Sequence, residues 1–470
     1  MTRTTAESPG NLERRLAESV VDTVGEAIPE ATIDAARRQV VWTLGSCLLG
    51  LGRDREAGVV AALRDLGGPG TASVIGSTAG ASPVTAGAVH GYLAKVPEYE
   101  DKYWIGGSHG YAVAAGVVPA AFAMADALGG VSGKRLLAAI VLAVDLQARL
   151  LVSTPDYTTD TGWNATYLYS SLGTAAAAAR LMELDAARTL DALGIAFAQA
   201  AGAMQCNAER AGVIPVQLAF GVRNGLSAAT LAQRGVTGPH EFLTGGYGLY
   251  NLQMAGQKLD LDRLLDGLGR RYLGDRIAFK AYPCGAVAHP ALDAVREVVG
   301  EGLAAENIER IRVVGSTRLG VMLRAAEAPG RNGVTGALFS LPWVLACVAV
   351  DGNLGLGHFE AAALADPRYG RVSERIEVVA EDARDDVVAT VELTDGRTLA
   401  SPPVRIPRGH PDRPLTTDEI IARYWDCWRH GSPDVQQADA ERALRLILTL
   451  ERVGDASDVL ACLRAKGDAG

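Results

Sequence analysis

The stretch YAVAAGVVPAAFAMADAL, residues 111–128, is apolar on every side of a helical period. A helix without a polar face has to be buried, so this segment predicts the centre of a helical core. A second largely apolar helix is predicted at 136–151, and helical periodicity continues in both directions along the chain. We therefore expect residues 12–265 to be almost entirely helical, with short turns that contain glycine.

The pattern changes near residue 300, where strands begin to alternate with helices. Strands are predicted at 308–314, 376–380, 387–393 and from 398 onward, and helices at 289–299, 339–350 and 417–463. The Asp395-Gly396 pair between the last two strands is a hairpin signal. We expect an α+β fold that is predominantly α, with a helical domain at 1–265, a smaller inserted α+β domain at 266–402, and C-terminal helices at 403–470 that return to the helical domain. A cleft between two domains is the default place for a ligand.

Composition excludes several classes of protein. The chain has 470 residues, of which 48% are hydrophobic. Its formal net charge of −9 argues against a nucleic-acid partner, because a protein that binds nucleic acid needs a basic surface. The longest nearly unbroken apolar run, 111–125, is shorter than the ~20 residues that span a bilayer, and the N-terminus has no signal-peptide pattern. Six scattered cysteines without a CxxC pair fit a reducing compartment. We expect a cytoplasmic protein with no nucleic-acid or membrane partner.

The common catalytic and nucleotide-binding motifs are missing from the sequence. No GxGxxG follows a predicted strand, and there is no Walker lysine, GxSxG elbow, HExxH pair or EF-hand spacing. An enzyme with this sequence is therefore expected to work with side chains alone, without a metal.

One charged segment, VHGYLAKVPEYEDKYWIGGSHGYAV at 89–113, could carry chemistry. Five charged residues crowd into its middle: Lys95, Glu98, Glu100, Asp101 and Lys102. His109 follows a glycine-rich turn just before the apolar helix, where the helix N-terminus favours a neutral histidine that suits general acid–base work. An acidic surface loop with a capping histidine explains the same residues equally well.

A second segment, RIAFKAYPCGAVAHPALDAV at 276–295, contains Lys280 directly after an apolar, strand-like run at 277–279, then Tyr282 and His289. An apolar pocket disfavours a charged lysine, which could then serve as base or acid. A lysine whose ammonium group reaches solvent at a domain junction is the alternative. Elsewhere, Asn164 at a helix start and Arg223 on an apolar helix could bind a carboxylate, although helix capping and a buried ion pair explain them too.

Eight segments in order form a pattern that runs from about residue 12 to about residue 463. They are TLGSCLLGLG (43–52), TASVIGSTAGASPVTAGAVHG (71–91), EYED (98–101) with His109, SGKRLLAAIVLAVDLQARL (132–150), SSLGTAAAAARLMEL (170–184), AATLAQRGVTGP (228–239), KAYPCG (280–285) with His289, and ALFSLPWVLACVAVDG (337–352). Together they resemble the MmgE/PrpD family, which includes 2-methylcitrate dehydratase, cis-aconitate decarboxylase and iminodisuccinate epimerase.

The resemblance implies a helical domain with an inserted α/β lid, a homodimer, and no metal or organic cofactor. It also implies a site at the domain junction that moves a proton next to a carboxylate of a small polycarboxylate. Carried over by position, the family's acidic triplet, acid–base histidine, cleft lysine and second histidine fall on Glu98, Glu100, Asp101, His109, Lys280 and His289.

The sequence also departs from the family pattern. Where members often carry a basic residue, this chain has Asn164, Ile214, Gln217 and Leu338; the histidine before the triplet is Lys95, and the aromatic residue after Pro342 is Trp343. An unpaired carboxylate in a closed site costs several kcal/mol, so fewer basic groups indicate a substrate with fewer carboxylates or a larger apolar body.

The leading hypothesis is a cofactor-free lyase or isomerase that transfers a proton at a carbon next to a carboxylate or carbonyl. The proposed catalytic residues are His109, Lys280, Glu98 and Asp101. The proposed substrate-binding residues are Lys95, Glu100, Lys102, Trp104, Asn164, Gln217, Arg223, Tyr282 and His289. Two alternatives stay open: a family member that cyclises, dehydrates or isomerises a larger apolar substrate, and a non-catalytic ligand-binding homologue.

Overall fold

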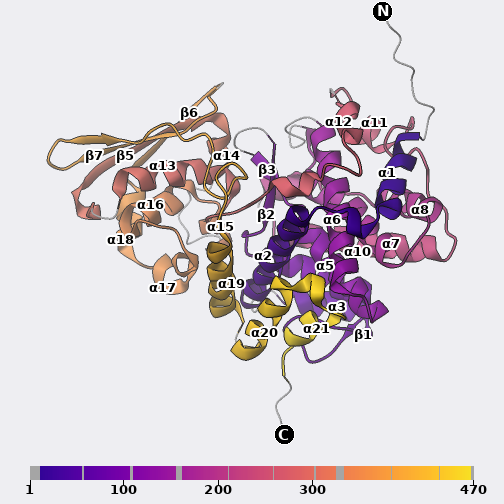
Figure 1. The fold of residues 1–470 in the computed structure, drawn as a ribbon. Helices are drawn as coiled ribbons and strands as arrows, with labels where there is room; N and C mark the ends of the chain where they lie inside the picture. The colour runs from indigo at the N-terminus through magenta and orange to yellow at the C-terminus, as the bar shows by residue number, and fades with distance from the viewer. Residues whose placement is uncertain are drawn as a thin grey trace, which may run out of the picture. The chain divides into compact units, whose positions relative to one another are not determined.

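The computed structural model describes residues 11–54, 58–105, 109–154, 161–209, 211–257, 259–300, 303–323, 333–382, 384–432 and 434–466. Its internal contacts divide the chain into two units (Figure 1). Unit 1 consists of Met1–Tyr103, Tyr111–Ile277 and Thr417–Gly470, and unit 2 of Trp104–Gly110 and Ala278–Thr416. Helices dominate and the sheets are small, which confirms the predicted α+β, predominantly α fold class.

Unit 1 is built around α5 (Ala114–Leu128), the helix predicted from the apolar stretch. Residues 114–125 of this helix are all buried, so the prediction of a buried core helix is confirmed. Helix α5 contacts α4 (Pro83–Lys95), α6 (Gly133–Ser153), α7 (Ala165–Leu181) and α10 (Ile214–Gln233). The remaining helices are α1 (Asn11–Asp22), α2 (Glu30–Asp54), α3 (Val59–Gly67), α8 (Ala186–Phe197), α9 (Gln205–Ala208), α11 (Leu249–Gln253), α12 (Leu261–Leu265), α19 (Thr417–Gly431), α20 (Gln437–Leu448) and α21 (Ser457–Cys462).

Helices α7 and α10 approach closely because glycine faces a hydroxyl side chain at two levels. A methyl group at Gly221 would lie 1.8 Å from Ser170 Oγ, and one at Gly225 would lie 1.9 Å from Thr174 Oγ1. Any larger residue at either position would push the helices apart. The small residues thus set the spacing of the helices in the core of unit 1.

Helix α6 is long and apolar enough to cross a membrane if only its length and composition are considered. However, 94% of its most apolar window is buried inside the protein. A core helix of a globular protein has the same character, and the burial of α6 identifies it as one.

The sheet of unit 2 has four strands in the order β6-β5-β7-β8. They are β5 (Ile308–Ser316), β6 (Ile376–Glu381), β7 (Val388–Leu393) and β8 (Thr398–Ala400). Strand β5 pairs in parallel with β6 and antiparallel with β7, and β7 and β8 form the hairpin that Asp395-Gly396 predicted. All four predicted strands are therefore present, within two residues of their expected starts.

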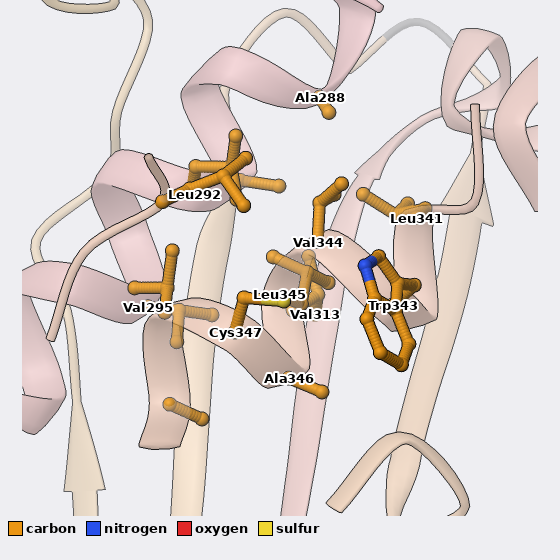
Figure 2. Close-up of a cluster of buried hydrophobic side chains, with 14 of the residues drawn as sticks. Ala288, Leu292, Val295, Val313, Leu341, Trp343, Val344, Leu345, Ala346 and Cys347 are labelled. Carbon is orange, nitrogen blue, oxygen red and sulfur yellow. The ribbon is translucent and has the colours of Figure 1, made fainter. Parts of the chain in front are cut away.

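Two helices of unit 2, α13 (His289–Val299) and α16 (Leu341–Asp351), contribute to the core beside this sheet. Figure 2 shows Leu292 and Val295 near Val344 and Cys347, with Val313 of β5 among them. The short helices α14 (Gly320–Leu323), α15 (Gly333–Leu338), α17 (Ala361–Leu364) and α18 (Pro367–Ser373) complete the unit. Unit 2 thus has its own hydrophobic core, as an independent folding unit requires.

A three-stranded sheet in the order β3-β2-β4 was not predicted. Its strands are β2 (Asp101–Ile105), β3 (His109–Tyr111) and β4 (Ile277–Phe279), and each contains a position where the chain passes from one unit to the other. The short strand β1 (Pro69–Ala72) lies in unit 1. The strand-like character of 277–279 was expected and corresponds to β4, but strands of three to five residues give too short a pattern to reveal their pairing.

The longer segment of unit 2 begins at Ala278, whereas the sequence analysis placed the start of the smaller domain at residue 266. The reason is Arg149 on α6, whose guanidinium donates to the carbonyl oxygens of Leu264, Asp266 and Arg271 at 2.7–3.1 Å. In addition, the backbone N–H of Leu273 donates to Asp145 at 2.7 Å. These buried bonds attach residues 264–273 to unit 1.

Unit 2 also ends at Thr416, later than the expected residue 402. Asp293 on α13 accepts a backbone hydrogen bond from Arg408 at 2.7 Å and a side-chain hydrogen bond from Arg413 at 2.9 Å. The N–H of Phe279 donates to the carbonyl oxygen of Gly409 at 3.0 Å. These bonds attach the proline-rich stretch at 402–414 to unit 2.

Candidate functional site

The charged segment predicted from the sequence lies in the short connection between α4 and β2 of unit 1. Helix α4 ends at Lys95, and β2 begins at Asp101. Between them Glu98 has φ = +53°, in the left-handed region, and its N–H donates to the carbonyl oxygen of Lys95 at 3.1 Å. That backbone conformation costs a residue with a side chain roughly 1–2 kcal/mol. The surrounding contacts must therefore hold Glu98 in place.

The side chains of this connection form a buried network of two lysines and two glutamates. Lys95 Nζ pairs with the carboxylate of Glu98 and lies 3.4 Å from Glu100 Oε1, while Lys102 Nζ lies 2.7 Å from the same Glu100 oxygen. The exposed fractions of these four side chains are 0–12%. Because the charges balance, each carboxylate stabilises the positive charge of a lysine away from water.

Asp101 has a different environment from its acidic neighbours. Its carboxylate accepts hydrogen bonds from the backbone N–H groups of Val113, Ala114 and Ala115 at 3.0, 2.9 and 2.8 Å. Burial raises the pKa of this carboxyl group, and the three backbone donors counteract that rise. Asp101 thus satisfies the free N–H groups at the start of α5 and fixes that helix to β2.

Tyr167 on α7 is a buried neighbour of the network that the sequence analysis did not select. Burial, and then the charge of Glu100, raise the pKa of its phenol well above the ordinary value. Tyr167 lies one turn after Asn164, whose side-chain oxygen accepts the N–H of Thr166 at 3.0 Å and so caps α7. The sequence could have identified Tyr167, because it lies one turn after Asn164, a proposed site residue at the start of the same helix.

The two candidate residues on α10 have different environments. Gln217, with Tyr167 and Ser171, lines a cavity of about 30 Å³. Among the described residues, neither Gln217 Nε2 nor Ser171 Oγ has a hydrogen-bond partner. Arg223 is exposed; it donates to Asn224 at 3.4 Å, and its guanidinium lies 4.9 Å from the ring centre of Phe220. The buried ion pair suggested as the alternative role of Arg223 is therefore not formed within the described part of the chain.

Unit 2 contains a second cluster, built on β4 and the start of α13. Lys280 is 2% exposed. Burial raises the pKa of the nearby Cys284 thiol to about 12, and the positive charge of Lys280 counteracts part of that rise. The hydroxyl of Tyr282 donates to Asp293 at 2.6 Å, and the Tyr282 and His289 rings meet edge to face at 5.3 Å. All three candidates of the second segment are thus buried, and Tyr282 and His289 are in contact.

The loop at 407–413 packs beside this cluster within unit 2. A side chain at Gly409, which has φ = +89°, would lie 1.9 Å from the carbonyl oxygen of Phe279, so only glycine fits there. The next residue, His410, has its ring 6.2 Å from the ring of Trp104. The candidate Trp104 is thus held by a loop far away in the sequence.

Three further residues from the sequence analysis have clear positions. Leu338 and Trp343 are each 3% exposed and belong to the hydrophobic core of unit 2, where Figure 2 shows Trp343 beside Leu341. Ile214 is buried at the start of α10. His109 lies in β3, but its side chain is outside the described residues.

No group of three or more metal-binding side chains is arranged to hold an ion within the described ranges. A separate cavity of about 670 Å³ in unit 1 is lined by residues that include Val21, Arg135 and Arg180, and it shares no residue with the charged connection. The arginines of this cavity bond to carbonyl oxygens near the ends of α1 and α7, which explains them structurally.

Comparisons with known proteins agree with the family suggested by the sequence motifs. The family model of the MmgE/PrpD N-terminal domain matches residues 14–262, and that of the MmgE/PrpD C-terminal domain matches residues 282–448. The two models together cover most of the chain. They fall on either side of residues 263–281, which include β4 and Lys280.

Several curated relatives share this similarity. A cis-aconitate decarboxylase-like protein, oryM, of Aspergillus oryzae is 27% identical over 494 residues, covering 98% of this chain and 99% of the relative. A cis-aconitate decarboxylase of Aspergillus terreus is 28% identical over 263 residues, covering 52% of each chain. The Homo sapiens cis-aconitate decarboxylase is 23% identical over 408 residues, covering 81% of this chain and 79% of the relative.

Proposed function

Because the chain belongs to the MmgE/PrpD family, we propose that it is a lyase that removes carbon dioxide or water from a small carboxylic acid. The family match and the names of the relatives support a decarboxylase- or dehydratase-like role. The chemistry proposed for both reactions is proton transfer at a carbon next to a carboxylate.

The observation that carries the proposal is the buried network of Lys95, Glu98, Glu100 and Lys102. Four buried ionised groups are not an efficient way to stabilise a fold, because a protein with apolar residues of similar volume in their place is often as stable or more stable. The left-handed backbone at Glu98 adds a further cost. Costly, strained and charged arrangements are typical of functional sites, and buried positive charge is what an anionic substrate needs.

The two reactions differ in the proton transfers that they require: decarboxylation needs one, to carbon, and dehydration needs two. In decarboxylation the C–C bond breaks, carbon dioxide leaves, and the electron pair left on carbon takes a proton from an acid. In dehydration a base removes a proton from carbon, and an acid protonates the hydroxyl that leaves as water. We propose that His109 transfers the proton at carbon. Lys280 acts either as the partner acid or as the cation that stabilises negative charge on the substrate.

The acidic residues have supporting roles in this proposal. Glu98 and Glu100 keep Lys95 and Lys102 in their charged form and in position for a substrate carboxylate. Asp101 holds the start of α5, and so fixes β2 against the core helix.

A substrate with fewer carboxylates than 2-methylcitrate is the second candidate. It is favoured by the uncharged residues on the helices next to the network: Asn164 caps α7, and Gln217 lines a small cavity. With Arg223 exposed, fewer positive groups are available for a tricarboxylate.

The test is proton NMR of the purified protein in deuterated buffer with cis-aconitate, 2-methylcitrate and iminodisuccinate. We expect loss of substrate signal, or exchange of the carbon-bound proton, with at least one of them. His109→Ala and Lys280→Ala should each abolish it, and Glu100→Gln should slow it about 100-fold. The exposed His240 and Lys466 supply matched controls, His240→Ala and Lys466→Ala, which should keep wild-type rates.

Full activity in both His109→Ala and Lys280→Ala would contradict the assigned proton transfers. No exchange with any of the three acids would exclude the small polycarboxylates and leave the larger, less charged substrate. Turnover of iminodisuccinate alone, with inversion at carbon, would make the protein an isomerase and overturn the lyase proposal.

A further inference from the structure

A single arginine from the C-terminal part of the chain reaches the charged connection of unit 1. Arg423 lies on α19, which packs against α2, and it is 6% exposed. Its Nη1 donates to the carbonyl oxygen of Trp42 at 2.6 Å. Its Nη2 lies 2.6 Å from both Ser46 Oγ and the carbonyl oxygen of Tyr99.

The guanidinium also contacts two aromatic rings. Its central carbon is 4.1 Å from the ring centre of Trp42 and 4.3 Å from that of Tyr99. The two rings in turn meet edge to face at 5.5 Å. Cation–π contacts of this kind strengthen when they are desolvated, as they are here. Arg423 therefore holds both the ring and the backbone of Tyr99.

Tyr99 is the residue between the two glutamates of the network. Its carbonyl oxygen is within hydrogen-bonding distance of Trp42 Nε1 at 2.9 Å, Ser46 Oγ at 3.1 Å and Arg423 Nη2. This carbonyl belongs to the peptide group whose N–H is that of Glu100. Fixing the plane of that peptide fixes the positions of the Tyr99 and Glu100 Cα atoms, and the ring contacts of Tyr99 hold the residue that directly follows the left-handed Glu98.

Gly45 on α2 provides the space that the arginine needs. A methyl group at this position would lie 2.9 Å from Arg423 Nη1 and 3.3 Å from the ring of Tyr424. Because no left-handed backbone is involved at Gly45, an alanine there would act through this contact and not through backbone strain. The residue at 45 thus offers a way to displace the guanidinium without removing its charge.

We propose that Arg423 is a positioning residue for the reaction: through Tyr99 it sets the orientation of Glu98 and Glu100, and through them the positions of Lys95 and Lys102. The proposal rests on the function proposed above for this network. It assigns to the C-terminal helices, which carry none of the reacting groups, control over the geometry of the site. A misplacement of about 1 Å in such a site can lower a rate by ~10²-fold.

The test compares Arg423→Lys and Gly45→Ala with Arg429→Lys, a matched control on the same helix. Arg429 has a side chain that is 60% exposed and, within the described part of the chain, pairs with Asp426 three residues earlier on the same helix. We expect both test variants to fold and to lose at least about tenfold in kcat, with KM changed by less than about threefold, because the reacting geometry and not substrate capture is disturbed. Arg429→Lys should match the wild type.

A second measurement does not depend on turnover. Deuterium uptake by the peptide covering residues 93–103, followed by mass spectrometry, should be faster in Arg423→Lys and Gly45→Ala and unchanged in Arg429→Lys. Faster uptake together with the loss of kcat supports the proposal. If the wild type turns over and the two variants keep its kcat, Arg423 has only a structural role and the positioning proposal is overturned.

If the wild type turns over none of the acids, the failure is that of the proposed function and the uptake measurement alone decides on Arg423. Faster uptake at residues 93–103 then supports control of the connection by Arg423. Unchanged uptake in both variants overturns it.

Discussion

Two regions of unit 1 bury ionised side chains, and they do so in different ways. On α6, Asp145 and Arg149 form one pair at 2.6 Å, and among the described residues the other hydrogen bonds of these side chains go to the backbone of residues 264–273. In the connection between α4 and β2, the side chains of two lysines form ion pairs with the side chains of two glutamates. The first arrangement joins two pieces of backbone, whereas the second concentrates charge in one place.

The difference shows that burial of charge is not by itself a mark of function. The guanidinium of Arg149 donates to three carbonyl oxygens and one carboxylate. These bonds give Arg149 a structural role that needs no ligand. The network at 95–102 instead brings two lysines and two glutamates into contact with one another and includes a left-handed residue. What the charged groups bond to therefore separates a structural pair from a candidate site.

The largest effect on stability is expected at the structural pair. Arg149→Met removes the guanidinium but leaves Asp145 and three carbonyl oxygens buried, so the free energy of unfolding should fall by about 3–5 kcal/mol. Urea unfolding followed by circular dichroism measures it. Arg135→Met on the same helix, with a side chain 47% exposed, is the control and should change it by less than about 1 kcal/mol. Equal losses would remove the distinction between the two regions.

In the network the main effect is expected on activity. Glu100→Gln keeps the shape of the side chain but removes the charge that faces Lys95 and Lys102, so kcat should fall about 100-fold, or about 2.7 kcal/mol. The exposed Glu441, which pairs with Arg445, supplies the control Glu441→Gln, with no change expected. A steady-state assay on the best substrate found by NMR gives both values. Wild-type kcat in Glu100→Gln would place the network with the structural pair.

A third buried group predicts how stability depends on pH. His90 on α4 accepts the N–H of Ile75 at 3.0 Å, and burial lowers its pKa from 6.5 to about 3. The unfolded chain binds the proton more readily, so this stability is complete above pH 6.5 and is lost as the pH falls from 6.5 towards 3. Between pH 7 and pH 5 the loss should be about 2 kcal/mol.

The variant His90→Gln tests this pH dependence, because glutamine does not titrate. Urea midpoints at pH 7 and pH 5 should differ less in the variant than in the wild type. An identical difference in both proteins would show that His90 does not control the acid sensitivity. His240, exposed and paired with Asp191, is the matched control position.

The smallest effect is expected from Asp101→Asn, which keeps one acceptor oxygen but loses the carboxylate that caps α5. We expect a loss of about 1–2 kcal/mol in the free energy of unfolding. Asp185 caps α8 through one exposed bond to the N–H of Arg188 at 2.8 Å, so Asp185→Asn should cost less. Thermal unfolding of both variants orders them, and a larger loss in Asp185→Asn would contradict the role given to Asp101.

Much of the fold could be predicted because local patterns were long. The apolar helix at 111–128 and the strands around 311, 378 and 390 have periodicity over many residues. The three-stranded sheet was missed because its strands have only three to five residues. Tertiary contacts, and not periodicity, give these segments their extended conformation.

The candidate site was only partly predictable for a related reason. The crowding of charge at 95–102 is visible in the sequence, but its pairing is not, because it depends on the turn at Glu98. Arg423 could have been noticed: it stands between Ile420, Tyr424 and Cys427 at helical spacing, on the face of α19 that is buried. A cation at a core position requires an explanation, and here the explanation lies more than 300 residues away, at Tyr99.

The sequence alone determined the class of the fold, its family resemblance and the list of residues that can carry charge or a proton, because composition and periodicity are local properties. Only the tertiary structure decided which of those charges are structural. Asp101 caps a helix, Leu338 and Trp343 fill a core, and Arg149 joins backbone segments, whereas Lys95, Glu98, Glu100 and Lys102 form ion pairs with one another. The role of a buried charge is set by its partners, and the partners of these residues are brought together by packing between segments that are distant in the chain.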